Sequence, residues 1–122
     1  IKAMVEAEAY HGPSIIIGYA PCEMHGVKGG MTNCQSEMKR AVEAGYWQMF
    51  RYNPALKAEG KNPLTIDCKE PTADYIDFIK SETRYSRLAQ QFPERATELF
   101  AKAEANAKAK YERLVKLSGL YE

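Results

Sequence analysis

The stretch that decides the fold is Gly12-Pro13-Ser14-Ile15-Ile16-Ile17-Gly18-Tyr19-Ala20-Pro21-Cys22. It begins with a turn signal, continues with β-branched residues and ends at a thiol. A short run that is apolar on both faces is typical of a central parallel strand, because helices cover both sides of such a sheet. Functional groups in open α/β sheets gather beyond the carboxyl ends of the strands. The sequence therefore predicts a parallel strand over residues 15–17, with Cys22 at its functional end.

Helical patterns lie on both sides of this run. Residues 1–10 have apolar residues at helical spacing, and His11-Gly12-Pro13 ends the predicted helix. A second helix is predicted over residues 32–46, opened by a capping box of Thr32 and Gln35. Its predicted buried stripe is Met38, Ala41, Val42, Gly45 and Tyr46.

The remainder of the chain predicts a strand pair and then helices. Residues 47–52 and 64–68 have strand patterns and are expected to pair antiparallel around a loop. Everything from residue 72 onward is expected to be helical, with a break at Pro93 and a C-terminal cap at Gly119. Two apolar sets are expected to be buried: Tyr75, Phe78, Ile79, Leu88 and Phe92, and then Phe100, Ala103, Ala107, Tyr111 and Leu114.

These elements place the chain in the α/β class: helix, parallel strand, helix and strand pair over residues 1–71, then a helical tail over residues 72–122. A parallel strand needs neighbours that are joined to it by crossover connections. This chain offers one such strand, and the helix before it has no strand of its own. We therefore expect the chain to be a fragment of a larger protein.

Composition excludes several classes of protein. The 122 residues carry a formal net charge of +1, so the basic excess of a nucleic-acid-binding protein is missing. No apolar stretch approaches the roughly 20 residues that span a bilayer, so no membrane partner is expected. The 3 cysteines form no C-x-x-C pair, which argues against a disulfide framework and favours a reducing, cytoplasmic setting.

Cys22 and His25 are the first candidates for chemistry. Cys22 could be a reactive or ligating thiol, but spacing alone favours a buried structural cysteine. The C-x-x-H relation to His25 could suggest zinc, which needs four ligands, whereas Cys34 and Cys68 are isolated in the sequence. His25 is therefore expected to contact a neighbouring residue, and Cys34 and Cys68 to be structural.

Two further groups leave alternatives open. Gly26, Gly29 and Gly30 with Lys28 could form an anion-binding nest, but they match no phosphate-loop motif, so a turn is favoured slightly. Arg51 could bind a carboxylate of a ligand, although stacking or a structural ion pair is the better interpretation.

Four blocks of the sequence resemble the pyruvate:ferredoxin oxidoreductase family, and they cover nearly the whole chain. The blocks are residues 12–22 with His25-Gly26, residues 41–47 with 50–54, residues 60–67 with Lys69-Glu70-Pro71, and residues 78–85, especially Ser81-Glu82 and Arg84-Tyr85, with Phe92-Pro93-Glu94.

The resemblance implies a homodimeric oxidoreductase of anaerobic metabolism. That family converts pyruvate and coenzyme A to acetyl-CoA and CO2 with thiamine diphosphate and Mg²⁺, and passes electrons through 4Fe–4S clusters to ferredoxin or flavodoxin. Residues 1–71 would be the C-terminal part of the thiamine-diphosphate-binding domain, and residues 72–122 a helical C-terminal segment. Cys22 matches the last ligand of the 4Fe–4S cluster nearest the thiamine diphosphate.

The resemblance also limits what this chain can do alone. It assigns no catalytic residue here, and it places the other cofactor ligands in the remainder of the same polypeptide, so the isolated chain is expected to be inactive. One alternative is a related enzyme for another 2-oxoacid, such as oxobutyrate. The other is a non-catalytic interaction module whose exposed half-sheet docks on a partner.

Overall fold

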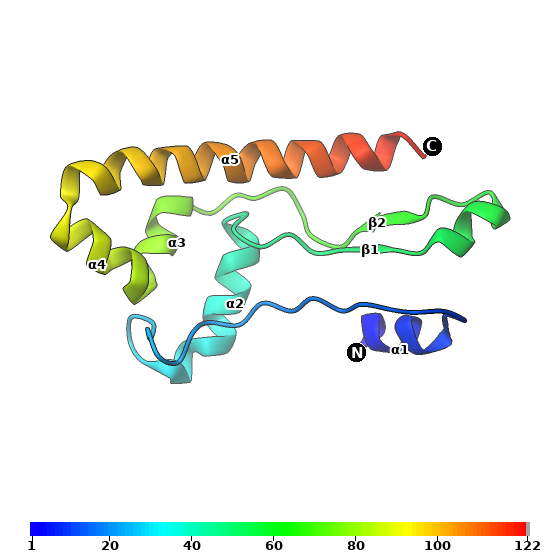
Figure 1. Cartoon of the computed structure of the whole chain (residues 1–122), viewed down its shortest axis with the longest axis horizontal. Helices are drawn as coiled ribbons and strands as arrows, with labels where there is room; N and C mark the ends of the chain where they lie inside the picture. Colours follow the sequence, from blue (N-terminus) through cyan, green and yellow to red (C-terminus); the bar gives the residue numbers. More distant parts are fainter. Residues whose placement is uncertain (122) are drawn as a thin grey trace.

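The computed structural model describes residues 1–121, so Glu122 of the predicted tail lies outside the described residues. The strands are β1 (Phe50–Tyr52) and β2 (Leu64–Ile66), and short 3₁₀ helices cover Met31–Asn33 (η1) and Pro54–Glu59 (η2). The α-helices are α1 (Lys2–Ala9), α2 (Cys34–Glu43), α3 (Tyr75–Ser81), α4 (Thr83–Gln91) and α5 (Pro93–Gly119). Helix α5 runs along one long side of the molecule beside β2, and α1 lies on the opposite side (Figure 1).

The core lies where α2, α3 and the first half of α5 meet. Its buried members are Ala41, Ala44, Tyr75, Phe78, Ile79, Ala96 and Phe100. Tyr75, Phe78 and Ile79 confirm the prediction for this segment, and Leu88 packs against the cluster while partly buried. Phe92 was predicted to be buried and is 56% exposed. Phe92 lies between the end of α4 and the start of α5, with an extended φ of −140°. It therefore belongs to neither helix, and the helical spacing used to predict its burial does not apply.

The apolar stripe of α5 is confirmed. Phe100 and Leu114 are buried, and Ala103, Ala107 and Tyr111 are partly buried between them. The predicted cap at Gly119 is wrong: Gly119 is the last helical residue, and Leu120 follows it in right-handed conformation. The helix needs no left-handed residue there, because the Leu120 amide donates to the Leu117 carbonyl at 3.2 Å.

The antiparallel strand pair is confirmed, with shorter strands than the sequence predicts. Phe50 pairs with Ile66, Arg51 with Thr65, and Tyr52 with Leu64. Helix η2 fills part of the connection. Its first turn is capped by the Asn53 side chain, which accepts a hydrogen bond from the Ala55 amide at 3.0 Å.

The predicted capping box of α2 is wrong. The helix begins at Cys34 after the η1 turn. The residue before it, Asn33, makes no capping hydrogen bond with its side chain. The Cys34 amide instead donates to the Met31 carbonyl, so the backbone turn replaces the Thr32 side chain. The predicted stripe is confirmed in part: Ala41 and Gly45 are buried, whereas Met38, Val42 and Tyr46 are only partly covered. Glu37 and Ala44, which were not predicted, are also buried.

Gly45 explains why α2 stops before residue 46. Its φ is +74°, a conformation that costs little only for glycine. A Cβ built there would lie 2.8 Å from Pro71 Cγ. The chain therefore reverses at Gly45, and Tyr46 faces the core from the turn.

The predicted parallel strand at residues 15–17 is wrong for this chain. Ile15, Ile16 and Ile17 are 87%, 56% and 75% exposed, and they form no ladder. A strand needs hydrogen-bonding neighbours, and the sheet in residues 1–121 consists of β1 and β2 alone. The broad α/β assignment therefore stands as helices with a small antiparallel sheet. Among the described residues, none of the helices has the length and apolarity required to cross a membrane.

Candidate functional site: the Cys22 loop

Cys22 opens a tight turn at the end of the extended N-terminal arm. The Gly26 amide donates to the Cys22 carbonyl at 2.8 Å, which closes the turn over residues 22–26. Cys22 is only partly buried, so the interpretation as a buried structural thiol is wrong. The turn presents its thiol at the surface.

His25 lies against this thiol, which confirms the expectation that it contacts a neighbour. Its Nδ1 is 3.0 Å from Cys22 Sγ. This hydrogen bond lowers the pKa of Cys22, because a donor beside sulfur stabilises the thiolate. The pair therefore favours the form of cysteine that binds metals.

The loop that carries Cys22 is anchored on both sides to the junction of α3 and α4. On one side, the Tyr19 hydroxyl donates to Glu82 Oε1 at 2.5 Å. On the other, Val27 and Glu82 form an isolated antiparallel bridge. The Lys28 amide donates to the Ser81 carbonyl at 2.8 Å, within the same junction. Residues 81–82 therefore hold the backbone before and after Cys22.

A buried polar network lies beneath this anchor. Glu82 has 0% of its surface exposed, and its Oε2 is 3.3 Å from Arg84 Nε. The Arg84 guanidinium donates to the Tyr46 hydroxyl at 2.7 Å, and Tyr46 and Tyr85 share a 2.9 Å hydrogen bond. Burial, together with the bond to Glu82, raises the pKa of Tyr19, which therefore remains a donor.

Sequence reasoning missed Glu82 and Tyr19 as parts of the site. Both residues lie in blocks that carry the family resemblance, Tyr19 in residues 12–22 and Glu82 in residues 78–85. Acidic residues are seldom buried without a partner. An acid and a base within one short helix junction, far from Cys22 in the sequence, give no spacing pattern that links them to the loop.

Cys34 and Cys68 are free and partly buried. Within residues 1–121, no group of three His, Cys, Asp or Glu side chains is arranged to hold a metal ion. A 4Fe–4S cluster takes four thiolates. Cys22 fits as one of those ligands, because its thiol is accessible and its thiolate is favoured, and this chain does not bring the other ligands to it.

The glycine-rich segment after Cys22 is a turn, as favoured. Gly26, Gly29 and Gly30 have φ values of 74°, 86° and 90°. The Gly30 amide donates to the Val27 carbonyl at 3.0 Å and so closes the turn. This turn brings the chain from the Cys22 loop into η1.

Arg51 makes the structural ion pairs that were favoured for it. Its Nε is 2.6 Å from Asp67 Oδ2, and its Nη1 is 2.5 Å from Glu6 Oε1. The Arg51 guanidinium lowers the pKa of Asp67. These carboxylates belong to the chain itself, so Arg51 joins α1 to the strand pair.

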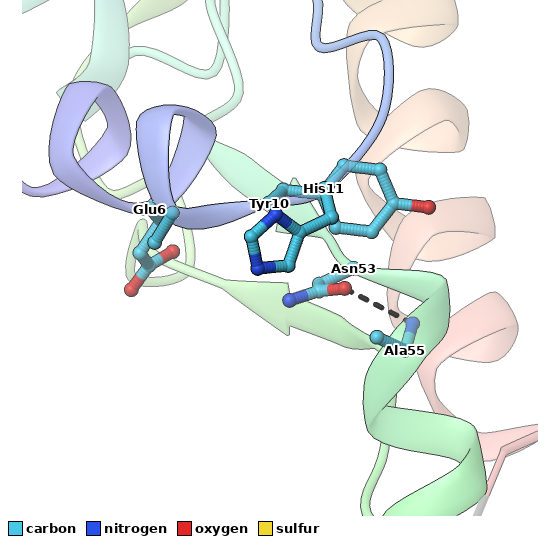
Figure 2. A pocket seen from close by; sticks show the side chains of 6 residues that line it. Glu6, Tyr10, His11, Asn53 and Ala55 are labelled. Carbon is cyan, nitrogen blue, oxygen red and sulfur yellow. Dashed lines mark hydrogen bonds between the residues drawn. The ribbon is translucent and has the colours of Figure 1, made fainter.

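A hollow of about 440 Å³ lies near Arg51, between the end of α1 and the start of η2 (Figure 2). It is lined by Glu6, Ala9, Tyr10, His11, Asn53 and Ala55. Asn53 is engaged in capping η2, and Glu6 binds Arg51. The extended arm separates the end of α1, where this hollow lies, from the turn that carries Cys22 (Figure 1).

Comparisons with known proteins give named relatives, although no protein-family model matches the chain. The chain is 58% identical over 118 residues to a pyruvate:ferredoxin oxidoreductase of Moorella thermoacetica, covering 97% of the chain and 10% of the relative. It is 45% identical over 119 residues to a pyruvate-flavodoxin oxidoreductase of Klebsiella pneumoniae, covering 98% and 10%. A mitochondrial pyruvate dehydrogenase [NADP(+)] of Euglena gracilis is 39% identical over 113 residues, covering 93% and 6%. The chain thus spans about a tenth of the length of these relatives or less.

Proposed function

This chain belongs to the family of pyruvate:ferredoxin and pyruvate-flavodoxin oxidoreductases, and we propose that it works as a segment of an enzyme that oxidises pyruvate. The proposed reaction converts pyruvate and coenzyme A to acetyl-CoA and CO2, with electrons delivered to ferredoxin or flavodoxin. The names of the relatives specify pyruvate, which favours this substrate over other 2-oxoacids. Identity over nearly the whole chain favours an enzyme segment over an independent interaction module.

The segment is not expected to select the electron acceptor. Relatives named for ferredoxin, for flavodoxin and for NADP(+) all match this same stretch. The acceptor site is therefore assigned to the remainder of the polypeptide. The groups that hold thiamine diphosphate and Mg²⁺ are assigned there too, because the resemblance places them outside this chain. The full enzyme is proposed to be a homodimer in the cytoplasm. The free cysteines fit such a reducing compartment.

Cys22 is the residue of this chain that we assign to a cofactor. Its thiol lies in a surface loop with His25 Nδ1 at 3.0 Å, and the loop is fixed on both sides to one helix junction. A bound 4Fe–4S cluster supplies one-electron transfer. Cys22 would hold one iron of the cluster near the thiamine diphosphate, and the other thiolates would come from the remainder of the polypeptide.

Cysteine-to-serine variants of the full-length enzyme test this assignment. Cys22→Ser should lower the iron content and severely slow ferredoxin reduction, while thiamine diphosphate still binds. Cys34→Ser and Cys68→Ser are matched controls, because both thiols are also partly buried, and they should keep normal iron content. Unchanged iron and unchanged electron transfer in Cys22→Ser would contradict the assignment.

A further inference from the structure

We propose that Glu82 is a positioning residue for the Cys22 thiolate, acting through the hydrogen bond that its side chain accepts from Tyr19. This inference rests on the proposed role of Cys22 as a cluster ligand. Glu82 has no contact with the thiol itself among the described interactions. Its effect is on the loop that presents the thiol.

The helix junction around Glu82 holds the loop at points on either side of Cys22. The Glu82 side chain accepts the hydrogen bond from Tyr19, which precedes Cys22. Glu82 also lies opposite Val27, which follows Cys22, in an isolated bridge. The hydrogen bonds of that bridge come from its neighbours: the Lys28 amide donates to the Ser81 carbonyl at 2.8 Å, and the Thr83 amide donates to the Gly26 carbonyl at 3.3 Å. The Glu82 side chain therefore fixes the arm before Cys22, and the backbone on either side of Glu82 fixes the arm after it.

Aromatic neighbours fix the orientation of the Tyr19 side chain. Its ring stacks on Trp47 with centroids 5.8 Å apart and meets Tyr46 edge-on at 5.5 Å. The ring packing limits where the hydroxyl can point, and Glu82 Oε1 receives it. Loss of that hydroxyl would leave a buried carboxylate oxygen without its donor, a costly arrangement.

The burial of Glu82 argues that it has a role other than general stability. A fully buried carboxylate pays a desolvation penalty that an ion pair often fails to recover. Its partner is imperfect: Glu82 Oε2 and Arg84 Nε are 3.3 Å apart, yet neither atom makes a hydrogen bond of good geometry. An apolar residue could fill the same space but could not receive the Tyr19 hydroxyl.

Glu37 provides an internal comparison. It is also buried, at 4% exposed, and its carboxylate accepts from Ser81 Oγ and pairs with Arg40 Nη1 at 3.0 Å. Those contacts join α2 to α3 and do not include Tyr19. Because the Ser81 carbonyl also accepts the Lys28 amide, Glu37 is linked to the arm after Cys22 and is not a neutral control.

The test uses Tyr19→Phe and Glu82→Gln in the full-length enzyme, with Tyr85→Phe as the matched control. Tyr85→Phe removes the same hydroxyl group from the same network, at a position that does not reach the loop. The first measurement is the rate at which iron is lost to a chelator. The second is the alkylation rate of Cys22 by iodoacetamide in enzyme stripped of its clusters, read by mass spectrometry of the Cys22 peptide.

Tyr19→Phe and Glu82→Gln should lose iron about tenfold faster, at the low end of the usual effect of residues that orient metal ligands. Their Cys22 alkylation rate should also change severalfold, and Tyr85→Phe should match the unaltered enzyme. Iron loss and alkylation at the control rate in both variants would overturn the inference. Equal effects in Tyr85→Phe would also overturn it, because they would show that any loss from this network loosens the loop.

Cys22→Ser separates this inference from the proposed function. If Cys22→Ser keeps its full iron content, the assignment of Cys22 as a ligand fails, and with it the positioning of a ligand by Glu82. If Cys22→Ser loses iron while Tyr19→Phe and Glu82→Gln retain it normally, the assignment of Cys22 stands and the role of Glu82 fails.

Discussion

The helices α3 to α5 and the N-terminal arm of residues 1–21 are both rich in apolar residues, yet they bury them very differently. Phe78 and Ile79 are 1% exposed, whereas Ile15 is 87% exposed and α1 has no buried residue. The helices find their partners within the chain. Residues 15–17 of the arm have the composition of a covered strand, yet all three isoleucines are exposed, and the arm meets the core only further on, at Tyr19. An apolar pattern therefore predicts burial only when the partner lies in the same segment.

The largest effect on the folded chain is expected from Phe78→Ala, at the centre of the helical core. Removing a fully buried phenylalanine side chain should lower the free energy of unfolding by about 3–5 kcal/mol. Urea denaturation of the chain followed by circular dichroism would measure the change. A loss below 1 kcal/mol would mean that the helical region is not the core of the molecule.

Leu114→Ala tests the other end of the same region. Leu114 is 7% exposed on the stripe of α5, so the change should lower the free energy of unfolding by about 2–5 kcal/mol. Leu117→Ala is a suitable control, because Leu117 is 41% exposed on the same helix. Equal effects of the two substitutions would show that the stripe does not pack.

The ion pair of Arg51 and Asp67 predicts a smaller, pH-dependent effect. The Arg51 guanidinium lowers the pKa of Asp67 from its usual value near 3.8. The resulting stabilisation is present above that value and is lost as the pH falls through the lowered pKa, where the folded chain takes up the proton. Because the pair is partly exposed, it should contribute no more than about 1 kcal/mol.

Asp67→Asn should remove this part of the acid dependence, as measured by thermal unfolding between pH 2 and pH 6, about the range over which a carboxylate titrates. Asp77→Asn is a control, since Asp77 pairs with Arg40 and its side chain is 78% exposed. An unchanged acid profile in Asp67→Asn would show that the pair is not formed in solution.

The smallest effect on the stability of the chain is expected at Ile16 in the arm. Ile16→Glu should change the free energy of unfolding by less than about 0.5 kcal/mol, as at other surface positions. Exposed apolar runs favour association, so the same change should reduce self-association of the chain in sedimentation experiments. A large loss of stability in the monomer would show that the arm packs on the chain after all.

The sequence predicted local structure well where neighbours in the chain complete it. The antiparallel strand pair and the α5 stripe were predicted because each depends on a regular period. For Arg51 the sequence favoured stacking or a structural ion pair without naming a partner, since Glu6 and Asp67 lie far from it in the chain. The cap of α2 and the end of α5 were wrong, since backbone turns supplied the hydrogen bonds that side chains or a left-handed glycine were expected to provide.

The candidate site was predictable only in part. Cys22 and His25 lie close in the sequence, so their contact could be expected from spacing. Glu82 lies far along the chain, at a junction whose position relative to the loop depends on how α3 and α4 pack. Spacing cannot report such a contact, which is why the anchor of the loop emerged only from the structure.

The most direct measurement is the distance between Cys22 Sγ and the nearest iron atom in an experimental structure of the full-length enzyme with its clusters bound. We predict that Sγ is bonded to one iron of the cluster near the thiamine diphosphate, with Tyr19 and Glu82 still in hydrogen-bond contact. A cluster whose irons are all bound by other thiolates, with Cys22 Sγ out of bonding reach, would contradict the central claim.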